Sequence, residues 1–143
     1  MNLLKAVLAY FGMVFGAGFV LGPIRLLLLV PRVGTRNAEL IESPVMLLAI
    51  VLAARWVARR WLATAGIWRQ LGVGIATVAL IQSGDILVGT LFRGMTITEI
   101  FIARDPVSGA VYYALLVVCA VMPCTARRTS MERTGAAPSF PRP

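Results

Sequence analysis

Long apolar runs interrupted by short polar segments set the pattern of this 143-residue chain. A helix needs about 20 apolar residues to cross the hydrocarbon of a bilayer, whereas barrel strands are alternating segments of about ten. The pattern predicts an all-α integral membrane protein with four transmembrane helices, at about residues 3–30, 44–62, 71–92 and 107–122. The second run has a short uncharged core, residues 43–54, and a buried or half-spanning helix is the alternative there.

These helices are expected to form one transmembrane domain over residues 1–124, with outer connectors at 31–43 and 93–106. Residues 125–143 are rich in Arg, Pro, Ser and Thr and lack hydrophobic periodicity. Such a composition predicts a disordered, basic cytoplasmic tail.

The composition supports the same class of protein. Hydrophobic residues make up 59% of the chain and charged residues 14%, and the mean hydropathy is +0.84. Soluble domains have only about 45–50% apolar residues. Lys5 precedes the first apolar run as in a signal peptide, but the run continues past Gly18 without a convincing small-residue cleavage site. An uncleaved first helix is therefore favoured.

Basic residues divide unequally between the two sides if the helices alternate in direction. One side has Lys5, Arg55, Arg59, Arg60, Arg69, Arg127, Arg128, Arg133 and Arg142, and the other has Arg25, Arg32, Arg36, Arg93 and Arg104. The positive-inside rule places the richer side in the cytoplasm. We therefore expect a multi-pass protein of the bacterial inner membrane with both termini cytoplasmic. Its basic inner rim should contact anionic lipids of the bilayer, and no nucleic-acid partner is expected.

Two glycine pairs in the first predicted helix have the spacing that lets helices approach closely in lipid: Gly12 with Gly16, and Gly18 with Gly22. They are the candidate packing residues of the chain. They favour a homo-oligomer or a membrane-protein partner.

A polar cluster interrupts the third apolar run. Asp85 lies about 21 Å along the helix from Leu71, and Gln82 shares its face. A carboxylate at that depth needs a partner, a wet cavity or a proton. Arg25 is the preferred partner and Arg93 the rival, and both an ion or proton site and a structural ion pair stay open. The polar connector residues that could face this cluster complete the candidate set: Arg32, Arg36, Glu39, Glu42 and Glu99.

The sequence offers few residues that could catalyse a reaction. The chain has no histidine, the commonest base and metal ligand. Cys119 and Cys124 are five apart, which is neither a metal nor a redox spacing. We expect no catalytic residue, no metal site, no cofactor and no enzymatic activity.

A shift of 62 residues aligns several landmarks of the two halves, including Gly22 with Gly84 and Ser43–Pro44 with Asp105–Pro106. Each of the latter pairs is a capping residue followed by proline, a signal for the start of a helix. The coincidences suggest a duplicated helical hairpin with both copies in the same orientation. Chance is the alternative.

The string GFVLGPIRLLLLVPRVGTRNAELIESPVML resembles the leading half of uncharacterised small bacterial inner-membrane proteins, over about residues 15–60. The resemblance implies no activity. Small multidrug-resistance exporters and fluoride channels share the size and helix count. The first predicted helix lacks the embedded glutamate of the exporters, and Asn37 lies in a connector rather than in the membrane as the channels require.

The sequence thus favours a non-enzymatic membrane subunit that works by helix packing, as an oligomer or with a partner. The alternative is a small transporter or channel in which Asp85 and Arg25 line an ion or proton path.

Overall fold

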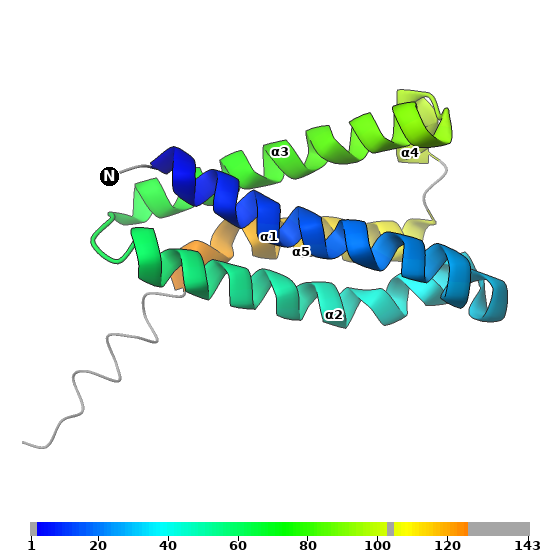
Figure 1. The fold of residues 1–143 in the computed structure, drawn as a ribbon, viewed down its shortest axis with the longest axis horizontal. Helices are drawn as coiled ribbons and strands as arrows, with labels where there is room; N and C mark the ends of the chain where they lie inside the picture. Colours follow the sequence, from blue (N-terminus) through cyan, green and yellow to red (C-terminus); the bar gives the residue numbers. More distant parts are fainter. Residues whose placement is uncertain (1–2, 103–104, 126–143) are drawn as a thin grey trace, which may run out of the picture.

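A computed structural model describes residues 3–102 and 105–125 of the chain (Figure 1). Every regular element in these ranges is a helix, which confirms the all-α prediction. The elements in order are α1 (Leu3–Ile24), the π-helical turn η1 (Arg25–Leu29), α2 (Val30–Trp61), α3 (Ile67–Arg93), the short α4 (Ile97–Ile102) and α5 (Pro106–Thr125).

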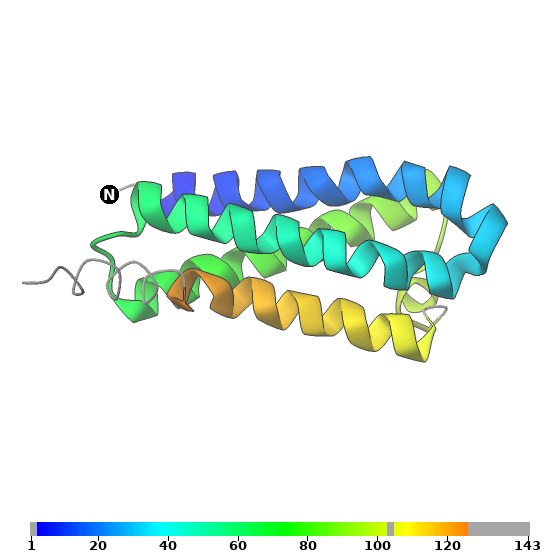
Figure 2. The same ribbon diagram turned by 90° about the horizontal axis from the view of Figure 1, so that it is seen from below.

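The four long helices form an elongated bundle, which Figures 1 and 2 show from two sides. α1 packs beside α2 and α3, and α5 packs beside the same two helices, so α1 and α5 occupy opposite corners. The α1–α2 turn and α4 lie at one end, which we call the hairpin end. The start of α1 and the α2–α3 connection lie at the other, which we call the opposite end.

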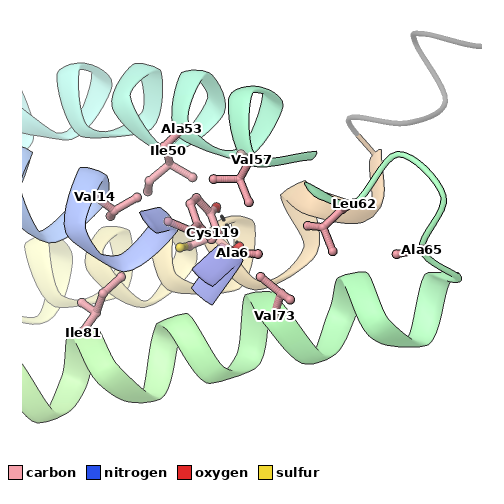
Figure 3. Close-up of a cluster of buried hydrophobic side chains, with 12 residues drawn as sticks. Ala6, Val14, Ile50, Ala53, Val57, Leu62, Ala65, Val73, Ile81 and Cys119 are labelled. Atoms are coloured by element: carbon pink, nitrogen blue, oxygen red, sulfur yellow. Dashed lines mark hydrogen bonds between the residues drawn. The ribbon is translucent and has the colours of Figure 1, made fainter. Parts of the chain in front are cut away.

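The core lies in the half of the bundle toward the opposite end and is built mainly from small side chains (Figure 3). Tyr10 is its largest fully buried residue, and its hydroxyl donates to the Cys119 carbonyl at 2.9 Å, which joins the two diagonal helices. Small residues let helices approach closely. α2 accordingly faces the core with Ala53, Ala54, Val57 and Ala58.

The structure differs from the predicted connector over residues 31–43. Helix continues through most of this stretch, and the chain turns back at Gly34, whose backbone is non-helical (φ 81°, ψ 163°). Ser43–Pro44 does not begin a helix. The Ser43 hydroxyl instead donates to the Glu39 carbonyl at 2.8 Å inside α2. Pro44 therefore lies inside α2. The helix tolerates the loss of one backbone hydrogen bond at this proline.

Elsewhere the observed helices lie close to the predicted ranges. Asp105 caps α5 as expected, because its Oδ2 accepts hydrogen bonds from the backbone N–H groups of Val107 and Ser108. α4 lies within the predicted second connector and was not anticipated. Most of the predicted tail, residues 126–143, lies outside the described residues.

Three helical stretches are long and apolar enough to cross a membrane: Leu3–Trp61, Ile67–Arg93 and Pro106–Thr125. The first contains the turn at Gly34 and comprises both arms of the α1–α2 hairpin.

Candidate functional site

The predicted pair Gln82 and Asp85 meets a partner from α5. The Tyr112 hydroxyl donates to Asp85 Oδ2 and lies 3.1 Å from Gln82 Oε1, and the three side chains are partly buried. A carboxyl, an amide and a phenol thus converge from two helices. This group, which we call the Asp85 cluster, can tie α3 to α5, and its oxygens can also hold a cation or a proton.

The Arg25–Asp85 pair preferred from the sequence is not among the ion pairs of the described residues. The two side chains lie at different heights along the bundle. Gly84, next to Asp85, lies against the ring of Phe15, so that a Cβ on Gly84 would be 2.6 Å from that ring. Arg25 is ten residues beyond Phe15, about 15 Å nearer the hairpin end at 1.5 Å per residue.

Arg25 instead pairs with two glutamates across the α1–α2 hairpin. Its Nη1 lies 3.1 Å from Glu42 Oε2 and 3.6 Å from Glu39 Oε1. Glu42 has the most buried side chain of the three, with 13% exposed. Its Oε2 has an ionic contact with Arg25 but no hydrogen bond of good geometry within residues 3–102 and 105–125. A buried charge without its partner is costly, so this triad fixes α1 against α2.

Arg36 links the hairpin to α5. Its Nε lies 3.5 Å from Asp105 Oδ2, the atom that also caps α5. The Arg36 side chain is 55% exposed, so this pair adds little stability by itself. The pair joins the turn of the α1–α2 hairpin to the start of α5.

The remaining candidates are separate from these groups. Arg32 is exposed near the turn, and Arg93 is exposed in the last turn of α3, where a cation suits the helix dipole. Glu99 caps α4 with Thr96: Glu99 Oε2 accepts from the Thr96 N–H at 2.8 Å, and the Thr96 hydroxyl accepts from the Glu99 N–H at 3.4 Å. The bonds from Thr96, the backbone one first, lower the pKa of Glu99. Glu99 therefore has a structural role.

Most of the predicted packing glycines of α1 do not pack against other parts of the chain that the structure describes. A Cβ added at Gly12, Gly16 or Gly22 would meet no other atom within 4 Å, and one at Gly18 would make ordinary contact with Met46. The close internal contacts belong to α3. A Cβ at Gly74 would clash with the Ala120 carbonyl oxygen of α5, and one at Gly89 would lie 2.7 Å from Ile100 of α4.

Sequence reasoning missed Tyr112 and the glycines of α3. Tyr112 follows the start of α5 by about two turns, and Asp85 precedes the end of α3 by about the same distance. Because α3 and α5 are antiparallel and are connected at that end, Asp85 and Tyr112 lie at the same height along the bundle. This relation was the signal in the sequence that could have identified Tyr112. The glycines of α3 do not have the four-residue spacing by which the α1 pairs were found.

In the part of the chain that the structure describes, no three histidine, cysteine or acidic side chains come together to hold a metal ion. No protein-family model matches the chain, and no match was found among curated proteins or solved structures.

Proposed function

We propose that the protein crosses the bacterial inner membrane four times with both termini in the cytoplasm. The proposal is supported by the apolar length of α3, α5 and the α1–α2 stretch, and by the turn at Gly34 that divides that stretch into two arms. Arg55, Arg59 and Trp56 lie exposed at the opposite end, which suits the cytoplasmic interface.

Within that membrane the protein acts as a non-enzymatic subunit that associates laterally with a second copy or another membrane protein through α1. The carrying observation is that Gly12 and Gly16 face open space while α1 is otherwise anchored in the bundle. Leu8 and Phe19 share this face and are 51% and 58% exposed. Small residues flanked by large apolar ones allow a partner helix to approach closely in lipid.

Disulfide cross-linking tests the association. In a background with Cys119→Ser and Cys124→Ser, Leu8→Cys is expected to form a cross-linked product on oxidation in membranes. Leu48→Cys, equally exposed but on α2, is the matched control and should remain uncrosslinked. Equal cross-linking at both positions would contradict the proposal, and the absence of a Leu8→Cys dimer would contradict association of two copies through α1.

A small transporter or channel is the second candidate, favoured by the partly buried Asp85 cluster between α3 and α5. Thr77, two turns earlier on α3, is fully buried, and its Oγ1 has no hydrogen-bond partner among the described residues, so polar atoms extend along this helix. Arg25 would then lie near the outer mouth, about 15 Å from the cluster.

Ion or proton flux into proteoliposomes tests the second candidate. Asp85→Asn keeps the shape and a hydrogen-bond acceptor for Tyr112, so loss of flux in a folded variant would support transport. Absence of flux in the wild type, or equal flux in both proteins, would exclude a role of Asp85 in transport.

A further inference from the structure

One face of α2 has apolar and cationic residues in line. Leu48, Leu52, Arg55 and Arg59 fall within about 60° of one another at 100° per residue. All four are exposed, and the leucines are 58% and 57% exposed. The opposite face of α2 is buried in the bundle. The stripe therefore faces away from the protein, with its leucines toward the middle of the helix and its arginines toward the end.

The arginines of this stripe have no carboxylate partner within the described residues. The three ion pairs found there all involve Arg25 or Arg36, at the hairpin end. The acidic residues that the structure describes belong to the first half of α2, the second half of α3, α4 and the start of α5, which all lie toward that end. The described part of the chain therefore does not neutralise Arg55 and Arg59, and the neighbouring Arg60, also exposed, adds a third cation.

We propose that this stripe is a binding site for an anionic phospholipid. A guanidinium binds phosphate oxygens in a two-pronged arrangement, and Arg55 and Arg59 present two of them one turn apart. The acyl chain lies along Leu52 and Leu48 in the hydrocarbon. Trp56, half exposed and packed edge-to-face on Trp61 at 5.2 Å between ring centres, marks the interface at the same depth. The site rests on the membrane insertion proposed above.

The chemistry favours a lipid with net negative charge over a zwitterionic one. In phosphatidylcholine the ammonium group balances the phosphate, so this lipid adds no net negative charge beside the arginines. Phosphatidylglycerol has only the phosphate charge, which can compensate the charge of the arginines. Each arginine near an anionic surface contributes about a fivefold preference.

Native mass spectrometry of the purified full chain tests the site. The protein is offered equimolar phosphatidylglycerol and phosphatidylcholine with identical acyl chains, and the bound fraction of each is counted. The variants are Arg55→Gln/Arg59→Gln and, as a matched control with the same charge loss at the hairpin end, Arg32→Gln/Arg93→Gln. The single variant Arg59→Gln provides a readout should the first pair fail to fold.

We expect the wild type and the control pair to retain phosphatidylglycerol preferentially. The preference should fall about fivefold in Arg59→Gln and further in the double variant. No preference in the wild type, or equal losses in the α2 variants and the control pair, would overturn the site. Carbonate extraction of membranes separates the two proposals. Release of the wild type would overturn membrane insertion, and the site with it, whereas retention without lipid preference would overturn the site alone.

Discussion

The two helical hairpins of the bundle, α1–α2 and α3–α5, reverse the direction of the chain with different turns. The first reverses at Gly34 within an otherwise continuous helical stretch, whereas the second uses a connector that contains α4. Ser43 and Asp105 are equivalent under the predicted 62-residue shift. Ser43 lies inside a helix and bonds to the Glu39 carbonyl, whereas Asp105 caps the start of α5. The two hairpins therefore differ at the turn, where the shift aligns these positions.

The glycines differ in the same way between the hairpins. Gly22 and Gly84 are also equivalent under the shift, yet Gly22 faces open space and Gly84 lies against Phe15. Gly74, Gly84 and Gly89 of α3 lie against neighbouring segments, whereas Gly12, Gly16 and Gly22 of α1 leave a face free. Motif spacing identifies glycines able to pack, and only the neighbouring atoms decide which ones do.

The largest difference in stability is expected between two valine substitutions on α3. Gly74→Val places a side chain against the Ala120 backbone, which cannot move aside as a side chain can, so we expect a loss of about 3 kcal/mol or more. Gly72→Val is the control, because Gly72 faces open space two residues away. Melting temperatures in detergent compare the two. A similar drop in both would show that the α3–α5 contact is not as close as described.

The turn of the first hairpin depends on the backbone of Gly34. Its φ of 81° with ψ of 163° is a conformation adopted almost only by glycine. Gly34→Ala is expected to destabilise the protein by about 1–3 kcal/mol. Gly16→Ala, in a helical and open position, should be neutral or slightly stabilising because alanine favours helix. If Gly34→Ala melts no lower than Gly16→Ala, the turn lies elsewhere.

Alanine at the two shift-equivalent positions, Ser43 and Asp105, tests the difference between the hairpins. Asp105→Ala removes the cap of α5 and the contact with Arg36, which should cost about 1 kcal/mol. Ser43→Ala removes only a hydroxyl bond to a carbonyl within a helix, and a smaller change is expected. Equal effects on chemical or thermal unfolding would mean that Ser43 also serves as a cap.

The smallest effect concerns α4, which only the second hairpin has. The hydrogen bonds that lower the pKa of Glu99 require its charged form. Capping is therefore complete above the ordinary carboxyl range and is lost as the pH falls through the pKa of Glu99. The protection of the Thr96 amide against hydrogen exchange should fall in step. Glu99→Ala should lack this protection at every pH, and a pH-independent wild type would contradict the cap.

Apolar run length predicted the ranges of α3 and α5 closely, because both helices are bounded by polar residues and by glycine or proline. It could not locate the first turn, since Pro31, Gly34 and Pro44 are all breakers and only tertiary packing selects Gly34. Within the site, depth in the membrane predicted that Asp85 needs a partner. It did not identify Tyr112, because a neutral phenol gives no charge signal in the sequence.

The account depends most on α2 crossing the membrane between the turn at Gly34 and the α2–α3 connection. Thr35 and Thr64 are exposed at these two places. The test uses a background with both native cysteines replaced by serine, in spheroplasts, which lack the outer membrane and keep the inner membrane intact. Thr35→Cys should react there with a membrane-impermeant maleimide. Thr64→Cys should react only after the inner membrane is permeabilised. Reaction of both from the same side would contradict the crossing, and the reverse pattern would contradict the orientation.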